Sequence, residues 1–127
     1  MPMRDLALSL VSKGAHGFQG SGTILSQLVP NLPPPPYVFG QVGTIVFDGT
    51  GNFSASSIQN FGGATVPATQ TGTYEVNSDC TAAWTVQTSL GLVVHDALVV
   101  TDRGQGFVTT ETDSFAVVNR RGQKLGN

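Results

Sequence analysis

The stretch "YVFGQVGTIVFDGTGNFSASSIQNF", residues 37–61, contains two runs of alternating residues on either side of the turn sequence "DGTGN" (48–52). Alternation with a period of two is typical of β-strands, and Asp-Gly between two such runs is a strong hairpin signal. Pairing across this turn aligns four pairs on one face: Phe47 with Phe53, Ile45 with Ala55, Gly43 with Ser57 and Gln41 with Gln59. This face is bulky at the turn and small or polar further along, so it can floor a cavity and leave space above it.

Further runs rich in β-branched and aromatic residues lie on both sides of this hairpin, with turn signals between them. We expect strands at residues 17–26, 37–49, 53–61, 70–76, 80–88, 92–101, 106–113 and 114–121, and a loop through Pro67. Short strands at regular spacing predict an antiparallel meander, and eight of them can close around one small ligand. The predicted fold class is therefore all-β: one up-and-down barrel domain over residues 1–127, with a two-sheet sandwich as the alternative. Strand glycines fit the bends of a small barrel: Gly20, Gly22, Gly40, Gly43 and Gly72.

Two segments do not fit the strand pattern. Residues 1–16 predict a short helix or a loose N-terminal arm, and the apolar run at 6–11 is too short for a typical export signal. The proline-rich segment 28–36 predicts a stiff, extended loop that crosses one mouth of the barrel as a lid. We expect a cytoplasmic protein, or an exported one if a signal peptide has been removed. No apolar stretch approaches the roughly 20 residues of a membrane span, so we expect no membrane partner.

The composition argues against several classes of function. Only 11% of the 127 residues are charged, the net charge is −2, and no basic stripe is present, so we expect no nucleic-acid partner. One cysteine and two histidines do not match a zinc site, and we expect neither a metal nor another cofactor. No Lys, Arg or His lies within five positions of Cys80, and Asp79 is beside it. Cys80 is therefore interpreted as a small packed residue at the start of a strand, and not as a nucleophile.

The stretch "GTYEVNSDCTAAWTV" (72–86) predicts a second hairpin, with its turn at "NSDC" (77–80). A four-residue turn places Tyr74 and Trp84 on opposite faces, one inside the barrel and one outside. Aromatic side chains can fill a core or line a pocket, and the Tyr74 hydroxyl can offer one oriented hydrogen bond. The candidate ligand-binding residues are Tyr74, Trp84, Phe39, Gln41, Phe47, Phe53 and Phe107.

The strand "LVVHDALVV" (92–100) carries the candidate polar chemistry. Alternation puts His95 and Asp96 on opposite faces, and both faces are otherwise apolar. A two-residue turn would pair three residues across to the next strand: His95 with Thr110, Asp96 with Thr109 and Val94 with Glu111. Glu111 would then be a diagonal neighbour of Asp96 on one face, and two such carboxylates can share a proton or divide acid and base roles. Alternatively, both carboxylates are solvated, or Arg103 or Arg120 neutralises one of them. The candidate catalytic residues are His95, Asp96, Glu111 and Tyr74.

The motifs "VGTIVFDGTGNFS", "GTYEVNSDCTAAWTV" and "TD…VVNRR" resemble a family of small bacterial β-rich proteins, over roughly residues 40–121. This resemblance implies no catalytic residues, because the family is largely uncharacterised. In architecture it is similar to the calycin-like barrels, among them lipocalins and allene oxide cyclase-type barrels, which is an analogy of fold and not of function.

Three functions fit these observations. The first is binding of a small, largely apolar molecule inside the barrel. The second is a cofactor-free cyclase or isomerase, which folds a flexible apolar substrate into a reactive shape and needs few titratable residues. The third is a structural protein, in which the apolar outer face of 92–100 forms a homo-oligomer.

Overall fold

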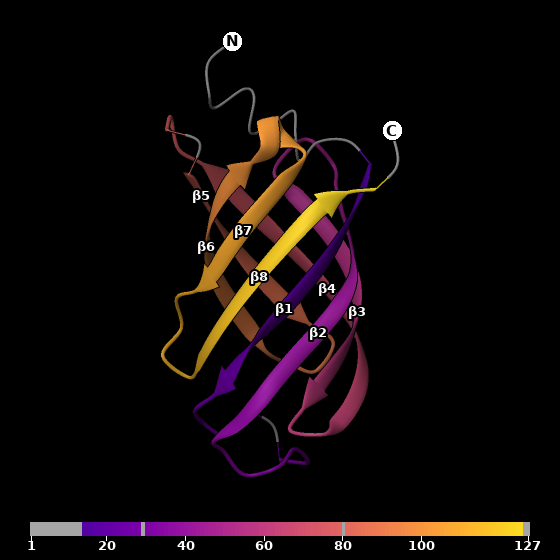
Figure 1. The fold of residues 1–127 in the computed structure, drawn as a ribbon, viewed down its shortest axis with the longest axis vertical. Coiled ribbons are helices and arrows are strands. Elements are labelled where there is room, and N and C mark those ends of the chain that lie inside the picture. The colour runs from indigo at the N-terminus through magenta and orange to yellow at the C-terminus, as the bar shows by residue number, and fades with distance from the viewer. Residues whose placement is uncertain (1–13, 29, 80, 126–127) are drawn as a thin grey trace.

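The computed structural model describes residues 14–28, 30–79 and 81–125, and these residues form a closed antiparallel barrel (Figure 1). Each strand pairs with the next one along the chain, and the last pairs with the first. The eight strands are β1 (Ala15–Ile24), β2 (Tyr37–Phe47), β3 (Asn52–Phe61), β4 (Ala64–Val76), β5 (Thr81–Thr88), β6 (Val93–Thr101), β7 (Gly106–Glu111) and β8 (Ala116–Lys124). The predicted up-and-down barrel is confirmed, and the two-sheet sandwich is wrong.

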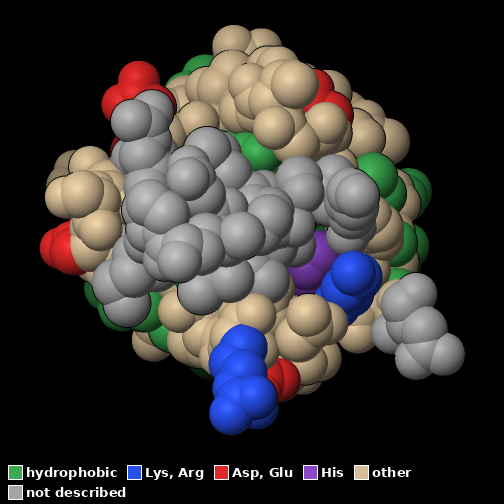
Figure 2. All heavy atoms as spheres, turned by 90° about the horizontal axis from the view of Figure 1, so that it is seen from above, with side chains coloured by type: hydrophobic (Ala, Val, Ile, Leu, Met, Phe, Trp, Pro, Cys, Tyr) green, Lys and Arg blue, Asp and Glu red, His purple; other side chains and the backbone are tan. Residues whose placement is uncertain are grey.

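The barrel has two ends, which we name by their connections. The turn end carries the connections after β2, β4 and β6, and β1 begins and β8 ends there (Figure 1). Figure 2 looks onto the turn end, where some Lys, Arg, Asp and Glu side chains lie around the rim among uncharged atoms. The loop end carries the connections after β1, β3, β5 and β7. This distinction matters because the two halves of the interior differ in chemistry.

The β2–β3 hairpin has the predicted register, including Phe47 with Phe53 and Gln41 with Gln59. The Asp48 side chain organises its turn, because Oδ1 accepts hydrogen bonds from the backbone N–H groups of Thr50 and Asn52, at 2.8 and 3.0 Å. This is the local pairing that makes Asp a turn residue.

The β4–β5 register differs from the prediction by one residue. Tyr74 pairs with Trp84 and Val76 with Ala82, so five residues separate the last two paired residues, and Asn77 donates its backbone N–H to the carbonyl of Thr81. A shift of one residue moves a side chain to the other face of a sheet. The prediction that Tyr74 and Trp84 point in opposite directions is therefore wrong, since both are buried inside the barrel.

The β6–β7 register differs from the prediction by two residues. Asp96 pairs directly with Glu111, because the connection is a four-residue turn that contains a short 3₁₀ segment (Asp102–Gly104). Asp102 and Arg103 both have positive φ in this turn, which the sequence does not signal. A shift of two residues keeps the face, so the predicted grouping of Asp96 with Glu111 still holds.

Strand β4 begins earlier than expected and runs through Pro67, so the predicted loop there is wrong. Proline is tolerated because β5 pairs with β4 only from Gln70 onward, which leaves one edge of β4 unpaired near Pro67. Two of the predicted barrel glycines are required by close strand approach. A Cβ atom at Gly22 would lie 1.8 Å from the Val117 carbonyl oxygen, and one at Gly43 would lie 2.2 Å from that of Ser56.

The interior contains two apolar clusters. The cluster at the turn end, which we call the aromatic plug, consists of Phe18, Ile45, Phe47, Phe53, Tyr74, Ala82, Trp84, Leu98 and Phe107. The cluster at the loop end consists of Ile24, Phe39, Phe61, Ala116 and Val118. Leu28 and Leu32 from the proline-rich connection pack against the loop-end cluster, so this connection folds over that mouth of the barrel.

On the outer wall, the predicted apolar face of 92–100 is only partly apolar, because His95 interrupts it between the exposed Val93 and Val99. The N-terminal arm up to residue 13 and Cys80 lie outside the described residues, and β1 begins at Ala15. Within the described part of the chain, no helix is long and apolar enough to span a membrane.

Candidate functional site

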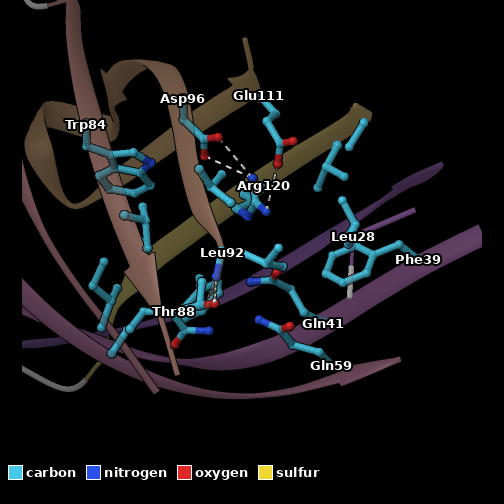
Figure 3. A pocket seen from close by; sticks show the side chains of 18 of the residues that line it. Leu28, Phe39, Gln41, Gln59, Trp84, Thr88, Leu92, Asp96, Glu111 and Arg120 are labelled. Carbon is cyan, nitrogen blue, oxygen red and sulfur yellow. Dashed lines mark hydrogen bonds and ion pairs between the residues drawn. The ribbon is translucent and has the colours of Figure 1, made fainter. Parts of the chain in front are cut away.

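A cavity of about 70 Å³ lies inside the barrel, between the aromatic plug and the loop end (Figure 3). Its wall is mostly apolar, and Trp84 and Leu28 lie on opposite sides of it (Figure 3). The apolar and aromatic residues that line it are Phe18, Ile24, Leu28, Phe39, Ile45, Phe53, Ala55, Phe61, Trp84, Val86, Leu92, Val94, Phe107, Phe115, Ala116 and Val118. Seven polar side chains complete the wall: Gln41, Gln59, Gln70, Thr88, Asp96, Glu111 and Arg120.

Three of these polar residues, Gln59, Gln41 and Arg120, lie in one row of paired strands, and Asp96 and Glu111 bond to Arg120; we call this group the polar belt. The strand pairings place five neighbours in one row across β3, β2, β1, β8 and β7: Gln59, Gln41, Gly20, Arg120 and Thr109. Gly20 gives the long side chains room, because a Cβ atom there would lie 2.8 Å from Cγ of Arg120 and 3.2 Å from Cγ of Gln41. The glycine therefore shapes the polar belt as well as the barrel.

Arg120 holds the two carboxylates together (Figure 3). Its Nη1 donates to both carboxylate oxygens of Asp96, at 3.0 and 3.1 Å, and its Nη2 donates to Oε1 of Glu111 at 3.3 Å. The Thr109 hydroxyl also donates to Asp96, at 2.9 Å. The side chains of Arg120, Asp96 and Glu111 are 12%, 1% and 2% exposed, so the group is almost dry. In such surroundings its charges interact strongly, because little water screens them.

The two carboxylates are not equivalent. Burial raises the pKa of Glu111 to about 7, an effect that Arg120 opposes and the charge of Asp96 reinforces. Asp96 accepts three hydrogen bonds, whereas Glu111 accepts one long bond from Arg120. Near neutral pH Glu111 is therefore present in both its protonated and its ionised form, and it can exchange a proton with a bound molecule.

Three buried acceptor atoms at the cavity have no hydrogen-bond partner among the described residues: Glu111 Oε2, Gln41 Oε1 and Gln70 Oε1. The Gln70 amide nitrogen is used, since it donates to the Ser57 hydroxyl at 2.8 Å, as Gln59 does at 3.3 Å. Buried polar groups in folded proteins are nearly always paired with protein or water. These three atoms therefore mark the positions where a bound molecule or water would donate hydrogen bonds.

The structure brings together only part of the predicted site. Asp96 and Glu111 meet at the cavity, and Phe39, Gln41, Phe53, Trp84 and Phe107 line it. Tyr74 and Phe47 are buried in the aromatic plug and do not line the cavity. His95 points outward, as its neighbour Asp96 requires, and its Nδ1 lies 2.8 Å from Oδ1 of Asp113. The candidate catalytic residue His95 therefore lies on the outer wall, away from the cavity.

Sequence reasoning gave Arg120 only as one possible neutralising charge and passed over Gln59 and Gln70. The sequence carries a signal for Arg120 and for Gln59. Alternation along β8 puts Ala116, Val118 and Arg120 on one face, which makes Arg120 the charged residue of an inward face. The predicted hairpin places Gln59 opposite Gln41 on the face expected to border a cavity, although only Gln41 is among the predicted ligand-binding residues.

No protein-family model matches this sequence, and the search of curated proteins found no significant relative. Within the described residues, no three His, Cys, Asp or Glu side chains are grouped as metal ligands. The site must therefore be interpreted from its own geometry.

Proposed function

We propose that the barrel binds a small, largely apolar molecule that carries at least one hydrogen-bond donor. The observation that supports this is the set of unpaired acceptors on Glu111, Gln41 and Gln70, in a cavity with otherwise mostly apolar walls. An unpaired buried polar group costs roughly 1–3 kcal/mol. A ligand that donates to these atoms removes that cost, whereas a barrel serving only as a scaffold would be more stable with an apolar belt.

The size of the cavity restricts the ligand. Pockets for drug-sized molecules measure roughly 300–1,000 Å³, and this cavity measures about 70 Å³. The ligand therefore has few heavy atoms, or the segment that carries Leu28 moves outward when a larger one enters. Leu28 is part of both the cavity wall and the loop-end packing, so the loop end is the proposed entrance.

Ala55 offers a direct test of cavity binding. It lines the cavity from β3, so Ala55→Leu would fill the space without adding a charge. Ala83→Leu on the exposed face of β5 is the matched control. Native mass spectrometry of the purified proteins should show a small molecule retained by the wild type and by Ala83→Leu, and lost from Ala55→Leu. Equal retention by both variants would show that the molecule binds elsewhere and would overturn the proposal.

A second candidate function is acid–base catalysis, as in a cofactor-free cyclase or isomerase. It is favoured by Glu111, whose pKa of about 7 and unpaired Oε2 suit a group that gives or takes a proton at neutral pH. On a substrate that the wild-type protein converts, Glu111→Gln should lower turnover by about 10²–10⁴-fold, while the substrate still binds. Unchanged turnover would leave binding as the function.

A further inference from the structure

The charges that line the cavity do not balance when Glu111 is ionised. Asp96 and Glu111 contribute two negative charges, and Arg120 is the one cation among the described lining residues. The guanidinium is already engaged by both carboxylates, at 3.0 to 3.3 Å. The cavity therefore carries a net charge of −1 in that state, and isolated negative charge is costly in a dry interior.

The described residues of the cavity wall also have more fully buried, unpaired hydrogen-bond acceptors than donors, which, like the excess negative charge, favours a ligand that is cationic and donates hydrogen bonds. Among the fully buried side-chain atoms of the described lining residues, three acceptors, on Glu111, Gln41 and Gln70, and one donor, Nε1 of Trp84, have no hydrogen-bond partner. A complementary ligand must donate more hydrogen bonds than it accepts. An ammonium group has three N–H donors and no acceptor, whereas a hydroxyl group has one donor.

The rest of the wall also suits a cation with an apolar body. Phe39, Phe61, Trp84 and Phe107 line the cavity, and the faces of such rings attract cations. An anion would meet two carboxylates and find no unpaired cation. The polar belt and the aromatic wall thus favour the same chemical class.

We propose that the ligand is a small alkylamine, bound as an ammonium ion that donates to Glu111 Oε2 and to the Gln41 and Gln70 amide oxygens. This inference rests on the proposed binding function and names its ligand class. The bound ammonium offsets the excess negative charge and pairs the unpaired acceptors. It also favours the ionised form of Glu111, so the protonated carboxyl releases its proton to solvent on binding.

Proton release gives the inference a specific pH dependence. The charged groups around Glu111 are Asp96 on β6, Arg120 on β8, and Asp113, which follows β7. An alkylammonium, like a lysine side chain, stays charged at pH 6 and pH 8. Because Glu111 is ionised mainly above pH 7, the affinity for an amine should rise about tenfold from pH 6 to pH 8.

The experiment measures binding of n-butylamine, butan-1-ol and butyrate by isothermal titration calorimetry at pH 6 and pH 8. We expect n-butylamine to bind tightest and to show the tenfold gain, and butan-1-ol to show none. Glu111→Gln should lower the affinity for n-butylamine at pH 8 about tenfold or more and abolish its pH dependence. Glu75→Gln removes a carboxylate from the exposed face of β4 and should change neither.

The possible failures are distinguishable. If butan-1-ol binds as tightly as n-butylamine and Ala55→Leu abolishes both, the cavity binds neutral donors: the amine class is overturned and the binding function stands. Tighter binding of butyrate overturns the amine class in the same way. If none of the three binds at millimolar concentration, the inference is overturned, while a molecule retained by the wild type in native mass spectrometry would still support the proposed function.

Discussion

The two halves of the barrel interior are built on opposite principles. At the turn end, the centroid of the Phe47 ring lies 5.3 to 6.1 Å from the centroids of five other rings, and most of these pairs are edge-on or tilted. Between this plug and the apolar loop-end cluster, a row of glutamines and an Arg120–carboxylate group surround a cavity. Both halves are formed by the same eight strands, so the difference lies in the inward side chains and not in the backbone.

The aromatic plug and the polar belt contribute differently to the stability of the protein. Close-packed aromatic rings give large favourable burial and edge-to-face contacts, and they leave no space for a ligand. A cavity, a buried charge group and unpaired amides all lower stability. Proteins often keep such features where they serve a site, which supports the proposal that the ligand binds at the polar belt and that the plug mainly stabilises the fold.

Phe47→Ala should have the largest effect on stability. Phe47 is 2% exposed, and its ring is at the centre of the plug. Truncation of a buried phenylalanine costs about 3–5 kcal/mol, which denaturant unfolding would measure. Ligand binding to the folded fraction should persist, because Phe47 does not line the cavity. A loss below about 1 kcal/mol would show that the plug is not the stabilising half.

Arg120→Met should have the next largest effect, because it leaves two carboxylates buried without a cation. Removal of one partner from a buried ion pair costs about 3–5 kcal/mol. At pH 8 we expect a loss of about 3 kcal/mol, which shrinks towards pH 5 as Glu111 becomes protonated. The matched control is Arg121→Met, since Arg121 is the next residue and lies on the exposed face. Equal losses in the two variants would contradict the buried charge group.

Glu111→Gln should stabilise the protein at alkaline pH. Since the pKa of Glu111 is about 7 in the folded chain and 4.5 is its ordinary value, the folded state favours the protonated form. The contribution of Glu111 to stability is therefore fully present below pH 4.5 and is lost as the pH rises through 7. The neutral variant avoids this loss, and at pH 8 it should be more stable by about 1–2 kcal/mol. Denaturant midpoints at pH 5 and pH 8 test this, and a variant that is less stable at pH 8 would contradict it.

His16, whose ring packs against Phe47 of the aromatic plug, gives the stability of this end of the barrel an opposite pH dependence. It is 1% exposed, and burial lowers its pKa below 6.5, with Lys124 adding to the effect. Its contribution to stability is present above pH 6.5 and is lost as the pH falls. His16→Leu should therefore unfold with a flatter pH profile between pH 7.5 and pH 5, as followed by melting temperature. A profile as steep as that of the wild type would assign the acid sensitivity to other groups.

The fold could be predicted because each strand of this barrel carries its own local signal. The Asp48 turn set the β2–β3 register correctly, since its length follows from side-chain hydrogen bonds within the turn. The predicted registers of the β4–β5 and β6–β7 hairpins are wrong by one and two residues, respectively. The reason is that the sequences of the turns after β4 and β6 do not specify the lengths of those turns. The two-residue difference in the β6–β7 register leaves Asp96 and Glu111 on the same face, as predicted. The one-residue difference in the β4–β5 register puts Trp84 on the same face as Tyr74, and not on the opposite one.

The site could be predicted only in part, for a related reason. Alternation identifies which residues share a strand face, but it cannot say which face is inside when both are apolar, as for Val93 and Val94 around His95. Closure of β8 onto β1 pairs Arg120 with Gly20 and so places it in the same row as Gln41, and no local pattern encodes such a pairing between residues far apart in the sequence.

His95→Gln should have the smallest effect, and it tests the assignment of inside and outside most directly. The His95 side chain is 50% exposed and pairs with Asp113 at 2.8 Å, and exposed pairs of this kind contribute about 0–1 kcal/mol. Its backbone N–H donates to Oδ2 of Asp113 at 2.7 Å, and this bond survives the substitution. We therefore expect a nearly unchanged melting temperature and unchanged ligand affinity. Asp96→Asn, one residue along, should by contrast weaken the charge group that Arg120 and Thr109 hold, and should alter ligand affinity. If His95→Gln reduces affinity as much as Asp96→Asn, the ligand reaches the outer wall, and the cavity is not its site.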